Sequence, residues 1–294
     1  MRENKVVYGL IGYGGMGRWH TEILSNVPEA VIGGIYDIKE EKREEAKEKG
    51  FFVYETEEAM LADPDIDVVL IATPNDGHKP IAIRAMHAGK NVISEKPVTL
   101  SSADLLEMEN AAKETGKLLT VHQNRRWDDD FLIIKKLVEE QKLGHVFRIE
   151  SRVHGSRGIP GDWRKEKVHG GGMVLDWGVH LLDQILYMYG DRKIETVYAS
   201  LTNVTNQEVD DGFTAILTFE GGTEVLVEVG TNNYISLPRW YVLGEDGTAV
   251  IRDWQLNGEI IRKTGRTEET VVPVKTAAGL TKTMAPRRED TIVK

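Results

Sequence analysis

A lysine stands directly after a short apolar strand and directly before a proline. Val92 and Ile93 predict a buried strand that runs into Glu95-Lys96-Pro97, and the proline prevents further pairing in the ladder. Ligands of an open α/β sheet bind beyond the carboxyl ends of its strands. An ammonium group held there could donate a hydrogen bond or a proton to a substrate oxygen. A solvated lysine in a surface turn is the other interpretation of these residues alone.

A second set of chemically capable residues follows a run of glycines at 170–172. Asp176 and His180 are four residues apart, so on a helix they share one face. Histidine titrates near neutral pH and can accept a hydroxyl proton, with the aspartate orienting its ring. A histidine satisfied within the core is the structural alternative. With Asp183 the pattern also offers hard ligands for a divalent ion, but no further cluster supports that reading, and we expect no metal ion.

The N-terminal region carries a glycine-rich turn between a strand and a helix. Residues 12–17 fit G-x-G-x-x-G after the apolar run 6–11, and a second apolar run, 30–36, ends in Asp37. The glycines serve a tight turn, close approach to a pyrophosphate and close helix packing. An acid at this position bonds the adenosine ribose and repels a 2′-phosphate. We therefore expect NAD rather than NADP, bound by Gly12, Gly14, Gly15, Met16, Gly17 and Asp37.

Strands and helices alternate through residues 1–123. The expected strands are 6–11, 30–36, 51–54, 67–72, 92–93 and 118–121. The expected helices follow Gly17 and cover 40–49 and 78–88, and another is capped by Ser101 or Ser102 and runs to Thr115. This alternation predicts a doubly wound parallel sheet, the Rossmann architecture. Right-handed crossovers then place all strand ends on one edge. That edge collects Gly12, Asp37, Thr73, Glu95, Lys96, His122, Gln123 and Asn124.

Residues 124–294 show a different pattern, which predicts a separate substrate-binding and oligomerisation domain of the α+β class. One amphipathic helix is expected over 128–141, followed by strands at 146–154, 194–202, 213–219, 224–230, 240–243 and 249–251. Hairpin turn signals between these strands predict an open, mainly antiparallel sheet with helices on one face. The other face is free to self-associate.

Bulk composition excludes several classes of protein. The net charge of −10 argues against a nucleic-acid surface. The sequence has no cysteine, which excludes disulfides and thiol chemistry and suits a reducing cytoplasm. No apolar run has the length of a membrane span or the character of a signal peptide. We expect a cytoplasmic protein that acts on a small molecule.

Taken together, the glycine turn at 12–17, Glu95-Lys96-Pro97, Asn124-Arg125-Arg126 and the Asp176-x3-His180 helix resemble the Gfo/Idh/MocA oxidoreductases, which include glucose–fructose oxidoreductase and inositol dehydrogenase. The resemblance spans the chain and implies a Rossmann domain followed by an open-sheet domain. It also implies a homodimer or homotetramer formed through the sheet of the second domain. It places Lys96, His180 and Asp176 at the substrate hydroxyl. It also places Thr73, Pro74, Asn75, His78, Glu95, Lys96 and Gln123 near the nicotinamide and its ribose, and implies a cis bond before Pro97. Chains of this family usually continue past a stretch like residues 284–288 with another helical segment, so we expect a sequence that stops at Lys294 to be truncated at its C-terminus.

The resemblance implies a reversible hydride transfer between NAD and a secondary alcohol of a sugar, a sugar derivative or a cyclitol. A lysine pKa of roughly 10.4 is high for proton exchange at neutral pH, so we favour His180 as proton acceptor and Lys96 as hydrogen-bond donor to the substrate oxygen. His154 and Trp163 are candidate substrate contacts, as are Arg157 and Arg164 for an acidic substrate. The alternatives are an NAD-dependent glycosidase that oxidises its substrate transiently and a non-catalytic dinucleotide sensor.

Overall fold

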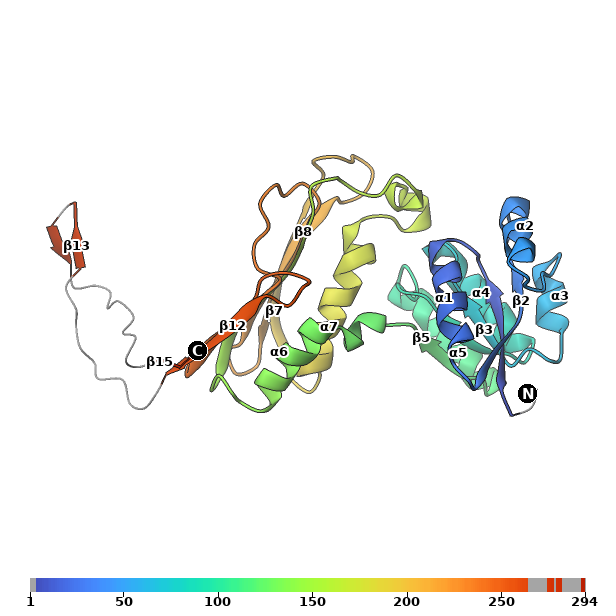
Figure 1. Ribbon diagram of the computed structural model, residues 1–294, viewed down its shortest axis with the longest axis horizontal. Coiled ribbons are helices and arrows are strands. Elements are labelled where there is room, and N and C mark those ends of the chain that lie inside the picture. Colours follow the sequence, from blue (N-terminus) through green and yellow to red (C-terminus); the bar gives the residue numbers. More distant parts are fainter. Residues whose placement is uncertain (1–3, 264–273, 278, 282–291, 294) are drawn as a thin grey trace. The chain divides into compact units, whose positions relative to one another are not determined.

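The computed structural model describes residues 4–263, 274–277, 279–281 and 292–293, and these form two compact units (Figure 1). One unit combines the chain up to Asn124 with Ile159–Val179 and Asn206–Val209, and the other holds Arg125–Gly158, His180–Thr205 and the chain from Asp210 onward. The sequence predicted one domain boundary, between residues 123 and 124. The structure differs because the segment 159–179 folds back onto the first unit, where it bonds to the loops at the strand ends.

The first unit is built on a five-stranded parallel sheet, as the alternation predicted. Its elements are β1 (Val6–Ile11), α1 (Gly15–Ser25), β2 (Ala30–Tyr36), α2 (Glu40–Glu48), α3 (Glu57–Ala62), β3 (Val68–Ile71), η1 (Asn75–Gly77), α4 (His78–His87), β4 (Asn91–Ser94), α5 (Ser102–Thr115) and β5 (Leu119–Val121). The strand order is β2-β1-β3-β4-β5, so the winding reverses between β1 and β3. Ligands bind at such a reversal in open α/β sheets.

Each face of this sheet has its own apolar core, because neighbouring side chains of a strand point to opposite faces. On one face Val7, Val69 and Val92 pack with buried side chains of α3, α4 and α5. On the other face Leu10 and Ile35 pack with Ala46 of α2 and with the partly buried Leu24 of α1. Helices thus cover both faces and leave the carboxyl edge of the sheet to the loops.

Local signals explain where the helices begin and end. The hydroxyl of Ser101 accepts a hydrogen bond from the backbone N–H of Asp104 at 3.2 Å, and Gly116 ends the same helix with φ +64°. The predicted strand at 51–54 was wrong: only an isolated bridge joins Ile35 to Val53. This stretch lies at the sheet edge beside β2, where Ile35 exchanges two backbone hydrogen bonds with it.

The second unit carries an eight-stranded sheet that is antiparallel except for one pair. Its elements are α6 (Asp129–Glu139), β6 (Val146–His154), α7 (Val179–Tyr189), β7 (Ile194–Thr202), β8 (Gly212–Phe219), β9 (Glu224–Gly230), β10 (Trp240–Gly244), β11 (Gly247–Ile251), β12 (Gly258–Lys263) and β15 (Ile292–Val293). The order is β15-β12-β11-β10-β6-β9-β8-β7, and β6 and β9 are the parallel pair. A separate hairpin joins β13 (Val274–Thr276) to β14 (Gly279–Thr281).

Helices α6 and α7 pack against one face of this sheet, as expected for a half-buried antiparallel sheet. The ring of Phe131 from α6 lies 6.3 Å from that of Trp240, and the ring of Tyr189 from α7 lies 5.3 Å from that of Phe219. Strands β8 and β9 alternate between buried and half-buried side chains. Among the described residues, none of the helices is both long and apolar enough to cross a membrane.

Candidate functional site

The glycine turn lies between β1 and α1, and two of its glycines are required by close backbone contacts. Gly12 has φ +97°, and a Cβ there would lie 2.5 Å from the carbonyl oxygen of Ala72. A Cβ on Gly17 would lie 2.1 Å from the carbonyl oxygen of Gly12. Contacts this short leave no room for a side chain, so these glycines serve the tight turn and the close helix packing.

Gly14 and Gly15 face open space at the start of α1. A Cβ added at either would meet no described atom within 4 Å. Gly14 is the N-cap and has no side chain to occupy the free N–H groups, and the first turn carries no acidic residue in its sequence. A helix N-terminus of this kind attracts anions through its N–H groups and dipole. The turn therefore fits a dinucleotide pyrophosphate, with half-buried Met16 beside it.

Asp37, directly after β2, is bonded to the same turn. Its Oδ2 accepts a hydrogen bond from the backbone N–H of Tyr13 at 2.7 Å, and its Oδ1 accepts one from the N–H of Lys39 at 2.9 Å. The residue is 9% exposed. Asp37 thus fixes the glycine turn to the end of β2, and its contact with a ribose stays a prediction.

The loop after β3 holds four residues that the family resemblance places near the nicotinamide: Thr73, Pro74, Asn75 and His78. The Asn75 amide donates to the carbonyl oxygen of Gly170 at 2.8 Å. The His78 ring lies 2.8 Å from the carbonyl oxygen of Pro97 and 3.1 Å from that of Thr73. Burial lowers the pKa of His78, although both carbonyl contacts act to raise it. A neutral ring has one N–H, so it donates to one carbonyl at a time and braces the loop against the turn at Pro97.

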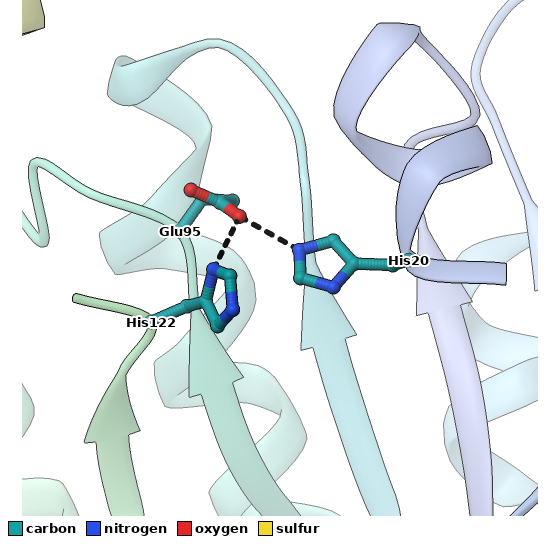
Figure 2. Close-up of side chains that lie close together, drawn as sticks. All are labelled: His20, Glu95 and His122. Carbon is teal, nitrogen blue, oxygen red and sulfur yellow. Dashed lines mark hydrogen bonds and ion pairs between the residues drawn. The ribbon is translucent and has the colours of Figure 1, made fainter. Parts of the chain in front are cut away.

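Glu95 is the most heavily bonded group at the end of β4 (Figure 2). Its Oε1 lies 2.7 Å from His20 Nε2 and 3.0 Å from His122 Nδ1, and its Oε2 accepts from the backbone N–H of Lys96 at 3.2 Å. Burial acts to raise the pKa of Glu95, but the hydrogen bonds and charges of the two histidines outweigh it and lower the pKa to about 2. The carboxylate is therefore ionised and fully engaged, and its contact with NAD stays a prediction.

Lys96 forms an ion pair that the sequence separates by eighty residues. Its Nζ lies 3.0 Å from Asp176 Oδ1 and donates to the Asp176 carbonyl oxygen at 3.0 Å. The Nε of Arg164 lies 3.2 Å from the same carboxylate oxygen. Burial acts to raise the pKa of Asp176, but the charges of Lys96 and Arg164 lower it. The bond between Lys96 and Pro97 is cis, as the resemblance implied.

The Asp176 segment is a π-helix, Val174–Gly178, that continues into α7. Such turns are rare and are frequent at functional sites. The spacing of Asp176 and His180 had suggested one α-helical face, whereas the structure places them in helices of different pitch. His180 is 6% exposed and belongs to the second unit. Its catalytic role stays a prediction.

The remaining predicted residues have varied surroundings. Gln123 donates to the carbonyl oxygen of Val179 at 3.2 Å, and the ring of Trp163 lies 4.7 Å from the guanidinium carbon of Arg164. His154 lies in the second unit at the end of β6. Its Nδ1 accepts from the N–H of Leu237 at 3.2 Å, and its Nε2 lies 3.1 Å from Glu228 Oε1. Substrate contacts by Trp163 and His154 stay predictions, and Arg157 is exposed.

Two features of the site escaped the sequence reasoning. The pairing of Glu95 with His20 and His122 joins residues 75 and 27 positions apart. Arg164, considered only as a substrate contact, is a partner of Asp176. The placement of His122 at the sheet edge was predicted, and its pairing with Glu95 could have been suspected from that. In the second unit, Asp183 pairs with Arg126 through two bonds of 2.6 and 2.7 Å.

Comparison with known proteins agrees with the geometry. The sequence model of an oxidoreductase family with an NAD-binding Rossmann fold matches residues 6–123, and that of the GFO/IDH/MocA C-terminal domain matches residues 131–250. The structure of an NAD-binding protein from Listeria innocua is similar, with a TM-score of 0.95 and 52% identity over 99% of this chain and 83% of that chain.

Two proteins of similar sequence are named as oxidoreductases or dehydrogenases. The scyllo-inositol 2-dehydrogenase (NADP(+)) IolW of Bacillus subtilis is 31% identical over 82% of this chain and 67% of its own length. The uncharacterized oxidoreductase YdgJ of Escherichia coli is 36% identical over 62% of this chain and 53% of its own length. The match thus spans about half of YdgJ and two thirds of IolW. Both domain models match in the expected order, and the chain belongs to the Gfo/Idh/MocA family of oxidoreductases.

Proposed function

We propose that the protein is an NAD(H)-dependent dehydrogenase that transfers a hydride between the nicotinamide and a secondary alcohol of a sugar, a sugar derivative or a cyclitol. The observation that carries this proposal is the pairing of Lys96 with Asp176 at 3.0 Å, in the unit that also holds the glycine turn. Oxidation of an alcohol by a bound nicotinamide can use both features, a turn suited to the pyrophosphate and a cation at the same sheet edge that bonds the substrate oxygen. The name of IolW supports a polyol as the substrate class.

The glycine turn and the loops beside it would hold the cofactor. Gly14 and Gly15 at the start of α1 suit the pyrophosphate, and Asp37 suits the adenosine ribose. When bound, the nicotinamide supplies the carbon that accepts or donates the hydride. IolW is named for NADP, so the preference for NAD rests on the negative charge of Asp37, which opposes a 2′-phosphate.

The chain's own residues handle the substrate oxygen and its proton. The lowered pKa of Asp176 keeps its carboxylate ionised at neutral pH, so it holds the Lys96 ammonium in place. Lys96 donates a hydrogen bond to the substrate oxygen, and His180 accepts the hydroxyl proton. Arg164 also pairs with the Asp176 carboxylate, so this carboxylate is shared between two cations. Trp163 and His154 are each proposed as substrate contacts.

Replacing Lys96 tests this proposal after a substrate has been found. Inositols, aldoses and sugar acids are screened with NAD and then NADP by the absorbance of the reduced nicotinamide. With the best substrate, Lys96→Ala should lower kcat by roughly 10²–10⁴-fold, while NADH binding followed by fluorescence stays within a few fold. The matched control is Lys136→Ala, because Lys136 has a side chain 73% exposed in the second unit.

Three outcomes would contradict the proposal. Near-normal turnover by Lys96→Ala would remove the lysine from the reaction. Glycoside cleavage without accumulation of NADH would favour an NAD-dependent glycosidase. NADH binding with none of the polyols or sugars oxidised would favour a dinucleotide sensor.

A further inference from the structure

His20, Glu95 and His122 come from three separate elements and converge on one point in the first unit (Figure 2). His20 lies in α1, Glu95 follows β4 and His122 follows β5. One ligand atom from each lies within 4.8 Å of the other two. His20 and Glu95 are 4% and 5% exposed. Two imidazoles and a carboxylate so placed, largely out of solvent, are the ligand set of many three-residue zinc sites.

We propose that His20, Glu95 and His122 form a binding site for a divalent transition-metal ion of the zinc type. Bonds of 2.0–2.2 Å in a tetrahedral shell separate two ligand atoms by roughly 3.3 Å. The observed separations from Glu95 Oε1 are 2.7 Å to His20 Nε2 and 3.0 Å to His122 Nδ1. Small side-chain shifts therefore admit an ion, and its fourth position is open to water.

The backbone of each ligand is held in place before any ion binds. The N–H of Glu95 donates to the carbonyl oxygen of Ile71 at 2.9 Å, and that of His122 donates to the carbonyl oxygen of Ser94 at 2.8 Å. His20 is fixed within α1. Glu95 Oε2 accepts the N–H of Lys96, which leaves Oε1 as a single ligand atom. Outer contacts of this kind orient the ligands of metal sites.

The chemistry of the three ligands selects the ion. The two imidazoles favour zinc, copper and nickel over magnesium and calcium, which prefer oxygen ligands. Each histidine must turn a lone pair rather than an N–H toward the ion, so its proton resides on the other ring nitrogen. The side chain of His122 is 27% exposed and provides the path of entry. Because Glu95 also bonds to Lys96, the ion would rigidify the turn that carries this lysine.

Zinc titration of the chelator-stripped full-length chain tests the site without substrate or NAD. A chromophoric chelator serves as competitor. One zinc ion should bind per chain, and His20→Ala and His122→Ala should each weaken binding by about 100-fold or more. The matched control is His87→Ala, an exposed histidine at the end of α4, which should bind zinc as the parent does. The melting temperature should rise with zinc in the parent and the control alone.

X-ray absorption of the zinc-loaded parent protein provides a second measurement that depends on no substitution. Two imidazoles and one carboxylate in the first shell would support the site even if a variant fails to fold. Zinc binding that is unchanged in both His20→Ala and His122→Ala would overturn it. So would a shell without two imidazoles, or no zinc bound at millimolar concentration, and the cluster would then be a hydrogen-bonded brace for the Lys96 turn.

Discussion

At the scale of single residues, Asp37 combines a structural bond with a charge that bears on cofactor choice. Its carboxylate accepts the N–H of Tyr13, which joins β2 to the glycine turn. The guanidinium of Arg43 donates to the carbonyl oxygens of Asp37 and Ile38 at 2.8 and 3.2 Å. A cation is therefore held beside Asp37, and the negative charge of Asp37 offsets it. Removing that charge would leave Arg43 available to a 2′-phosphate.

Asp37→Asn separates these two roles, because the amide oxygen still accepts the Tyr13 N–H but carries no charge. We expect kcat/KM with NADP to rise about 10-fold or more relative to that with NAD, equivalent to about 1.4 kcal/mol. Steady-state kinetics with both cofactors measures the ratio. Asp37→Ala, which also loses the hydrogen bond to Tyr13, should weaken the binding of both NAD and NADP. An unchanged ratio in Asp37→Asn would show that another group sets the preference.

His78 makes the stability of the first unit depend on pH. Burial lowers its pKa below the ordinary 6.5, with the charge of Lys96 adding to and that of Glu95 opposing this effect. The unfolded chain therefore binds a proton at this position before the folded chain does. The stabilisation is complete above pH 6.5 and is lost as pH falls from there through the lower folded-state pKa.

His78→Gln removes this titration while keeping a side chain that can hydrogen-bond. At pH 8 the variant should be less stable by about 1–2 kcal/mol from weakened hydrogen bonds. Below pH 6.5 the free energy of unfolding of the parent should fall more steeply, by up to about 1.4 kcal/mol per pH unit. Urea denaturation between pH 8 and 5 measures both slopes. Parallel curves would mean that His78 is protonated in the folded state as readily as in the unfolded one.

At the scale of elements, regular patterns were predictable and short edge segments were not. The strands at 30–36, 146–154 and 194–202 have the predicted bounds, and β-branched or aromatic residues, which favour strands, recur along each of them. The run 51–54 is more apolar but forms only a single bridge to β2, the edge strand of the sheet. The π-helical turn at Asp176 was not predicted, and neither were its tertiary contacts to Lys96 and Arg164, which spacing along the chain does not encode.

The candidate site was predictable to the extent that topology gathers residues at strand ends. Glu95 and His122 follow neighbouring strands, β4 and β5, so parallel pairing alone brings them to one edge. The contact between His20 and Glu95 could not be predicted, because it depends on how α1 is rotated and how close it lies to the sheet. Packing at the glycine turn determines both. The pattern of apolar residues predicts the length of a helix and which of its faces is buried, but predicts its position on the sheet only coarsely.

The start of α1 allows a matched pair of substitutions. Gly17→Ala forces a Cβ within 2.1 Å of a backbone oxygen, so we expect a loss of about 1–3 kcal/mol and a lower melting temperature. Gly14 has φ −77° and open space around its would-be Cβ, so Gly14→Ala should melt within about 2 °C of the parent. The added methyl group should nevertheless weaken NADH binding at least about 10-fold by obstructing the pyrophosphate.

Thermal melts and NADH fluorescence titrations on both variants measure these effects. Destabilisation by Gly14→Ala equal to that by Gly17→Ala would mean that Gly14 serves the fold. NADH affinity unchanged in Gly14→Ala would place the phosphates elsewhere.

At the scale of the whole molecule, the second sheet has a face turned away from α6 and α7. Tyr198 on β7, Ile216 on β8 and Leu226 on β9 are paired in register and form an apolar row across three strands. Tyr198 is 62% exposed, and the other two side chains are half-buried. An exposed apolar row on an open sheet favours association with another protein surface, and it supports our expectation that two or four copies of the chain assemble through this sheet.

Tyr198→Asp tests that expectation, because a charge on this row is tolerated by a free surface but not by an interface. We expect the parent to sediment as a dimer or tetramer and the variant to shift toward monomer, since burying an unpaired carboxylate costs several kcal/mol. Analytical ultracentrifugation over a range of concentrations measures the shift. The matched control is Val197→Asp. Val197 is 64% exposed and pairs in register with the buried Leu217 of β8, so its side chain lies on the face of the sheet opposite to that of Tyr198. A monomeric parent, or equal dissociation by both variants, would place the interface elsewhere.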